Sequence, residues 1–113
     1  MVTVAHARRL FLEQPESEEK AHMGHPDFRV GGKIFATLWP DRKVAVVRLS
    51  VADQTGALQM NPEALSLKFW GKSPYLEVDL ERANAALVRA LAKAAWRNIA
   101  PKRRLAQAKV AEK

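Results

Sequence analysis

The sequence predicts an α+β fold, a two-layer sandwich in which one antiparallel five-stranded sheet is covered by helices on one face. Gly31-Gly32 separates two alternating apolar runs, as in a hairpin whose two-residue turn needs positive φ. Pro40-Asp41-Arg42 marks a second reversal, because proline presets φ at a turn and aspartate bonds its own backbone. A long alanine-rich run near the C-terminus predicts the main covering helix.

The chain is expected to begin with a helix over residues 3–14. Apolar residues recur there at spacings of three and four, and Thr3 is a suitable N-cap. Pro15 and the acidic run at residues 16–20 end this helix. They predict an exposed loop that leads to the hairpin.

Three consecutive antiparallel strands are expected between residues 28 and 50. With a two-residue turn, Val30 lies opposite Lys33 and Phe28 lies opposite Phe35. The pairing predicts two partly apolar faces, either of which could meet the helices. One face carries Phe28, Val30, Phe35 and Thr37, and the other carries Arg29, Ile34, Ala36 and Leu38.

The middle of the chain predicts a helix and two further strands. The helix spans residues 52–60 with Asp53 at its start, and Asn61-Pro62 predicts another helical start of about one turn. The strands are expected over Leu67–Trp70 and Tyr75–Leu80, around a glycine- and proline-containing loop.

The longest helix is expected over Glu81–Ile99, which contains no glycine or proline. Trp96 lies beside its apolar stripe and is expected to pack against the sheet, with its indole N–H bonded to an acceptor. The predicted element order is α-β-β-β-α-β-β-α. The stripe consists of Leu87, Val88, Leu91, Ala94 and Ala95.

Length and composition predict a single domain over residues 1–113 and a cytoplasmic location. The 113 residues suffice for one core, and the absence of cysteine suits a reducing compartment. The first nine residues carry charge where a signal peptide needs an apolar segment. No apolar run approaches the roughly 20 residues of a membrane span, so no membrane partner is expected.

The net charge of +7 is unevenly distributed along the chain. Residues 1–28 carry 3 Lys and Arg against 5 Asp and Glu, a net −2. Residues 29–113 carry 16 against 7, a net +9. A strongly basic body attracts polyanions, of which nucleic acid is the first candidate.

A family resemblance is carried by residues 24–38, which run Gly-His-Pro-Asp-Phe-Arg-Val-Gly-Gly-Lys-Ile-Phe-Ala-Thr-Leu. With Ala95-Trp96-Arg97 and Ala100-Pro101, this segment resembles the MmcQ/YjbR-like family over nearly the whole chain. The resemblance implies the same element order, in a YjbR-like sandwich likened to secretion-chaperone folds, and a bacterial source. Members of that family are described as double-wing DNA-binding proteins, so it also implies DNA as a partner.

The residues themselves offer little for catalysis. No serine lies in a glycine-flanked elbow, and Gly31-Gly32-Lys33 joins two strands instead of opening a helix as a phosphate loop does. His22, His25 and Asp27 have a weak metal-ligand spacing, which we interpret as a solvated loop and the start of a strand. We therefore predict no catalytic residue, no metal site and no cofactor.

Cations at the turns and at the C-terminal end form the predicted interface. Hairpin tips that carry Lys and Arg are suited to contact phosphates. Trp39, Trp70 and Tyr75, near strand ends, would stack on bases if they are exposed. The predicted nucleic-acid-binding residues are Arg29, Lys33, Arg42, Lys43, Lys68, Lys72, Arg97, Lys102, Arg103 and Arg104.

Three functions remain open from the sequence, and an enzyme is the least favoured of them. The first is non-enzymatic DNA binding through phosphate neutralisation, with little reading of bases. The alternative is a protein-interaction or chaperone-like module, which would use a sheet edge or face and which includes the case of a homodimer.

Overall fold

The structure is a computed structural model and describes residues 1–22 and 24–100. Its helices are α1 (Val4–Leu12), α2 (Val51–Met60) and α3 (Ala85–Ile99). Its strands are β1 (Glu18–His22), β2 (His25–Val30), β3 (Lys33–Trp39), β4 (Val44–Val47), β5 (Leu65–Trp70) and β6 (Ser73–Asp79).

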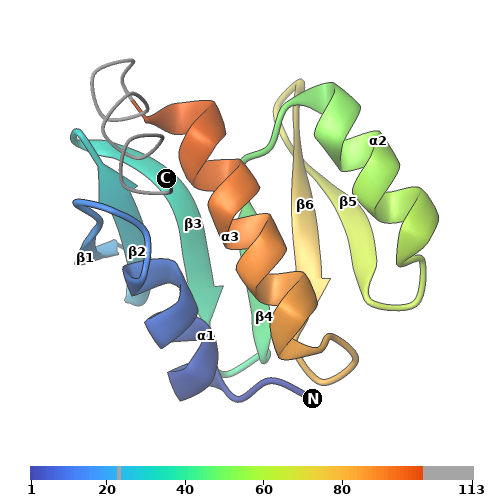
Figure 1. The fold of residues 1–113 in the computed structure, drawn as a ribbon, viewed down its shortest axis with the longest axis horizontal. Coiled ribbons are helices and arrows are strands. Elements are labelled where there is room, and N and C mark those ends of the chain that lie inside the picture. The colour runs from blue at the N-terminus through green and yellow to red at the C-terminus, as the bar shows by residue number, and fades with distance from the viewer. Residues whose placement is uncertain (23, 101–113) are drawn as a thin grey trace, which may run out of the picture.

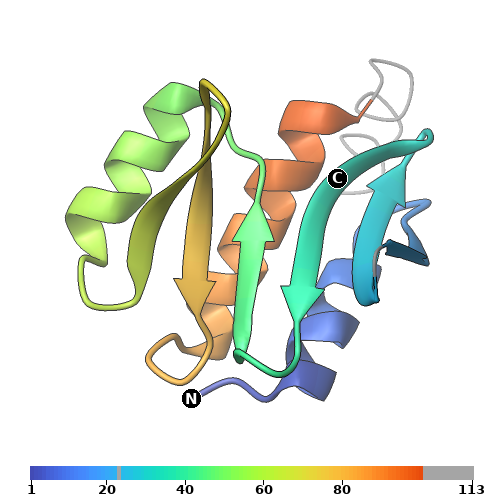
Figure 2. The same ribbon diagram turned by 180° about the vertical axis from the view of Figure 1, so that it is seen from behind.

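The strands form one antiparallel sheet in the order β1-β2-β3-β4-β6-β5. All three described helices lie on the same face of this sheet (Figure 1). Figure 2 shows the other face, which no described helix covers. The predicted α+β sandwich is therefore confirmed. No helix of the described part of the chain is long and apolar enough to cross a membrane.

The predicted number of five strands is wrong, because the sheet has six in the described residues. The additional strand is β1, which we had predicted as an exposed loop. It pairs with β2 from Glu18 opposite Arg29 to His22 opposite His25. Glu18, Lys20 and Ala21 of this edge strand are exposed, and such a strand needs no apolar alternation, so the sequence of β1 contains no strand signal.

The register of the β2–β3 hairpin also differs from the prediction. Val30 does lie opposite Lys33, but Phe28 lies opposite Ala36 instead of Phe35. Phe35 is the extra residue of a β-bulge in β3, and a bulge shifts every pairing beyond it. Periodicity alone does not reveal an inserted residue, because both faces of this hairpin are partly apolar.

The bulge changes which side chains meet the helices, so the predicted division of the two faces is wrong. Thr37 lies on the uncovered side, in register with Asp27 of β2 and Val46 of β4. The hairpin residues that join the core are Phe28, Val30, Phe35, Ala36 and Leu38.

The helix ends follow their capping residues. The N-cap of α1 is Thr3, as predicted, and its hydroxyl accepts from the His6 N–H at 3.0 Å. Helix α2 begins at Val51, one residue before the predicted start, with Ser50 as its N-cap and Asp53 in its first turn. Helix α3 begins after Asn84, four residues later than predicted. The single turn predicted at residues 61–65 is present as a hydrogen-bonded turn at 62–64, in which the Asn61 carbonyl accepts from the Ala64 and Leu65 N–H groups at 3.2 and 3.1 Å, and it leads directly into β5.

The core lies between the sheet and the layer of α1 and α3. Phe11 of α1 packs on Phe28, with ring centroids 5.0 Å apart. Trp96 of α3 is 1% exposed, and its indole N–H donates to the Pro15 carbonyl at 2.9 Å, as the sequence predicted. Of the predicted stripe of α3, Val88, Leu91 and Ala95 are buried, and Leu87 and Ala94 are half-buried.

Candidate functional site

The antiparallel order of the strands separates the turns into two groups. The β2–β3 turn, with Lys33, and the β5–β6 turn, with Lys72, lie at one end of the sheet (Figures 1 and 2). The β3–β4 turn, with Arg42 and Lys43, lies at the opposite end. The predicted turn cations are therefore split between two ends of the molecule.

Helix α3 ends at the same end as Lys33 and Lys72. The Asn98 side chain near its last turn donates to the Arg48 carbonyl at 2.9 Å, just beyond β4. Arg97 is exposed on this last turn. We call this group the basic end; it consists of Lys33, Arg48, Lys72 and Arg97.

The chain leaves the basic end at Ala100 towards residues 101–113, which lie outside the described residues. Residues 1–100 carry 14 Lys and Arg against 11 Asp and Glu, a net +3. Residues 101–113 carry 5 against 1, a net +4. More than half of the net charge thus follows α3 in the sequence. The predicted site residues Lys102, Arg103 and Arg104 belong to this segment.

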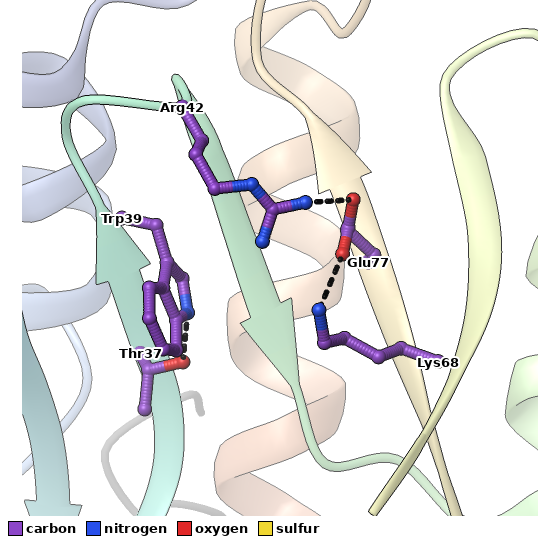
Figure 3. Close-up of polar contacts among 5 residues, drawn as sticks. All are labelled: Thr37, Trp39, Arg42, Lys68 and Glu77. Carbon is purple, nitrogen blue, oxygen red and sulfur yellow. Dashed lines mark hydrogen bonds and ion pairs between the residues drawn. The ribbon is translucent and has the colours of Figure 1, made fainter.

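Three of the predicted cations are held by carboxylates on the uncovered face of the sheet, which we call the open face. Arg29 donates to both oxygens of Asp27, at 2.8 and 3.1 Å, and these bonds raise the pKa of the Arg29 guanidinium. Arg42 and Lys68 lie on either side of Glu77, at 3.3 and 3.4 Å (Figure 3).

The turn-tip lysines differ from these paired cations. Lys33, Lys43 and Lys72 are exposed and form no ion pair within residues 1–22 and 24–100. When a cation paired with a carboxylate binds a phosphate, its ion pair is weakened or broken. An unpaired cation exchanges only bound water for the phosphate. The turn tips are therefore better placed for a polyanion than the paired cations of the open face.

Two aromatic pairs lie on the open face. Trp39 stacks on His25 with centroids 3.8 Å apart, and its indole N–H donates to the Thr37 hydroxyl at 3.1 Å (Figure 3). Trp70 is 41% exposed and packs on Tyr75 at 4.6 Å. All of the aromatic residues named from the sequence for base stacking are thus on one face.

A cavity of about 340 Å³ lies between these two pairs. Arg48 reaches over it from the basic end, with its guanidinium carbon 5.5 Å from the centre of the Tyr75 ring. We call this cavity the aromatic cavity. Its lining residues are His25, Ile34, Thr37, Trp39, Arg48, Trp70 and Tyr75.

The structure places the weak metal-ligand set in other roles. His25 stacks on Trp39, and Asp27 is the partner of Arg29. The side chain of His22 lies outside the described part of the structure. Among the described residues, no group of three or more His, Cys, Asp or Glu is placed to hold a metal ion.

Sequence reasoning missed Arg48 and His25 as members of this site. Arg48 follows an apolar strand and resembles any solvated strand end, and His25 precedes a proline in what we took for a loop. Both residues could have been found only by noting that their side chains fall on the same sheet face as Trp39 and Tyr75 of neighbouring strands. That signal requires the strand order, which a single sequence does not provide.

Comparisons with known proteins agree with this architecture. The sequence profile of the family described as YjbR matches residues 12–98. The crystal structure of Deinococcus radiodurans protein DR2400, which has a DUF419 domain, superposes with a TM-score of 0.71 at 19% sequence identity. The alignment covers 85% of this chain and 77% of that one. No curated protein matches the sequence significantly.

Proposed function

This chain belongs to the YjbR family, and for this member we propose non-catalytic DNA binding through the cations of the basic end. The observation that carries the proposal is the convergence of two lysine-tipped hairpin turns and the end of α3 on one end of the sheet. Lys33 and Lys72 act as the tips of two wings that flank the phosphate backbone.

The contacts are electrostatic and largely independent of base sequence. Each phosphate that a Lys or Arg neutralises releases condensed counterions, so affinity falls with salt. The chain continues from this end into residues 101–113, with their net charge of +4. Lys102, Arg103 and Arg104 therefore add to the proposed interface, whereas Arg29, Arg42 and Lys68 are assigned to ion pairs.

The test is the salt dependence of binding to a labelled duplex and to one of its single strands. Between about 50 and 200 mM salt, the logarithm of the affinity should fall linearly with the logarithm of the salt concentration. The double substitution Lys33→Gln, Lys72→Gln should reduce the slope for the duplex by roughly 2. Replacing Lys102, Arg103 and Arg104 together by Gln should reduce it by up to about 3.

Lys43→Gln is the matched control. It removes one positive charge from an exposed turn at the opposite end of the sheet, so the proposal expects an unchanged slope. If Lys43→Gln lowers the slope by about 1, which is the effect expected for each wing lysine, the basic end is not the interface. If neither DNA form binds at about 50 mM salt, the function itself is refuted.

A second function, self-association, is favoured by an apolar flank beside the edge strand β5. Leu67 and Phe69 of β5 are 47% and 59% exposed on the helix side, where they line a shallow hollow together with the exposed Val51 of α2. An edge strand offers unpaired backbone groups to a second copy of this chain. Sedimentation should then show a concentration-dependent dimer that Phe69→Glu abolishes; a monomer at all concentrations contradicts it.

A further inference from the structure

From the aromatic cavity we infer that the polyanion bound by this protein is single-stranded, with an unpaired nucleobase inserted between the two aromatic pairs of the open face. The inference rests on the proposed DNA binding and specifies its substrate class. It concerns a surface other than the turn tips, because the cavity is built on the face of the sheet that the described helices leave open.

The walls of the cavity suit a flat ring. The His25–Trp39 pair and the Trp70–Tyr75 pair each hold their own rings in contact, at 3.8 and 4.6 Å between centroids. The Trp39 ring is also oriented by its bond to Thr37. Aromatic side chains held in this way lose little conformational entropy when a base stacks on them.

The polar groups of the cavity suit a ring that is attached to negative charge. Arg48 supplies a cation above the Tyr75 ring, and among the described residues no Asp or Glu lines the cavity. A cationic ligand would find no counter-charge there. The walls are mostly flat aromatic rings, with Ile34 as the aliphatic member of the lining, so they match the shape of a planar ring better than that of a flexible acyl chain. A nucleobase on a phosphate backbone satisfies both the rings and Arg48.

The cavity is continuous with the basic end. Ile34 of its lining directly follows the wing residue Lys33, and Trp70 lies two residues before Lys72. Arg48 belongs both to the basic end and to the lining of the cavity, so a strand held at the basic end reaches the cavity at Arg48. A base in a duplex is stacked and paired, so only an unpaired base can enter.

The volume sets the scale of the ligand. At about 340 Å³ the cavity is at the small end of ligand pockets. The aromatic cavity is therefore large enough for one or two nucleobases and too small for a longer stack of bases. We expect modest sequence preference, since every base has a π-face.

The experiment compares three labelled probes at one low salt concentration by fluorescence anisotropy. The probes are an oligothymidine of about 12 nucleotides, a strand of equal length with abasic sites throughout, and a duplex of equal length. The abasic strand retains the phosphates and lacks the rings. The inference expects the oligothymidine to bind at least about 5-fold more tightly than the abasic strand.

Trp70→Ala should weaken binding of the oligothymidine by roughly 5- to 150-fold and leave the abasic strand unchanged. Leu12→Ala is the matched control: Leu12 is 39% exposed, close to the 41% of Trp70, but it lies on α1, on the covered side of the sheet. It should leave both affinities unchanged. Circular dichroism establishes that both variants fold.

The outcomes separate this inference from the proposed function. If the three probes bind equally and Trp70→Ala has no effect, the base site is overturned and phosphate binding stands. If no probe binds, both are overturned. If free thymidine monophosphate binds as tightly as the oligothymidine, the ligand is a mononucleotide and the single-strand inference is wrong.

Discussion

The two faces of the sheet are built from the same strands and differ in what their side chains contact. The covered face is apolar: Phe28, Leu38 and Val78 pack with Trp96 beneath α1 and α3. The open face alternates aromatic pairs with carboxylates that hold Arg and Lys. Because successive side chains of a strand point to opposite faces of the sheet, apolar residues lie on the covered face and their neighbours in sequence lie on the open face.

The difference explains why the open face can be exposed to solvent without a second layer of helices. Arg29, Arg42 and Lys68 are paired with carboxylates there, and the aromatic rings pack in twos, so the apolar surface left to water is divided into small parts. Burial on the covered face stabilises the fold. The open face is thereby available for a ligand, and substitutions on the two faces should have different consequences.

The largest contrast in stability should be between two tryptophans. Trp96→Ala removes a 1% exposed side chain from the covered face and should cost about 3–5 kcal/mol. Trp70→Ala removes a 41% exposed one from the open face and should cost less than about 1 kcal/mol. Urea denaturation measures both. Equal losses would contradict the division of roles between the faces.

The next largest effect should come from the ion pair between Arg29 and Asp27 on the open face, because its carboxylate is fully buried. The Asp27 side chain is 0% exposed, so Arg29→Met leaves a buried carboxylate without its guanidinium. We expect a clear fall in Tm, larger than that of Arg42→Met, whose partner Glu77 retains Lys68. Adding Asp27→Asn should restore part of the loss. Equal Tm values for Arg29→Met and Arg42→Met would contradict this interpretation.

Removing Glu77 should change binding more than stability. Glu77→Gln releases Arg42 and Lys68 together and should change stability by less than about 1 kcal/mol. If DNA crosses the open face, the two released cations should tighten binding several-fold at low salt. Glu63→Gln is the control, because it removes an equal charge from a carboxylate that pairs with no cation of residues 1–22 and 24–100. Equal gains in both variants would indicate a general charge effect.

The smallest effect should be found on the helical layer, where Arg89 of α3 donates to Glu13 at 3.1 and 3.2 Å. This hydrogen bond lowers the pKa of Glu13 from 4.5. The folded state thus binds the proton less readily than the unfolded one. The pair stabilises the fold above pH 4.5, and its contribution is lost as the pH falls through the folded-state pKa.

Glu13→Gln should therefore lower Tm at neutral pH by about 2 °C or less, since both partners are largely exposed. Thermal melts at several pH values would show this difference shrinking below pH 4.5. A difference that grows in acid would contradict the assigned direction of the pKa shift.

Much of the fold could be predicted because its signals are local. The Gly31-Gly32 turn, the Thr3 cap and the apolar stripe of α3 each depend on residues within a few positions of one another. Both glycines of that turn have positive φ, at 60° and 80°. Trp96 was also interpretable locally, because a buried indole needs an acceptor.

The errors in the prediction have a common physical origin. β1 is a strand only because β2 lies beside it, and the bulge at Phe35 is defined only by the partner strand. The candidate site has the same origin. The separation of Lys43 from Lys33 and Lys72 follows from strand direction, and the pairing of Arg42 with Glu77 joins residues 35 positions apart.

The sequence by itself determined the helices, the hairpins, the basic charge and the identity of the aromatic residues, since these depend on local conformational preference and composition. The tertiary structure decided which cations are paired, which face stays open and which rings share a cavity. The reason is that these properties depend on strand order and register, which arise from contacts between distant segments.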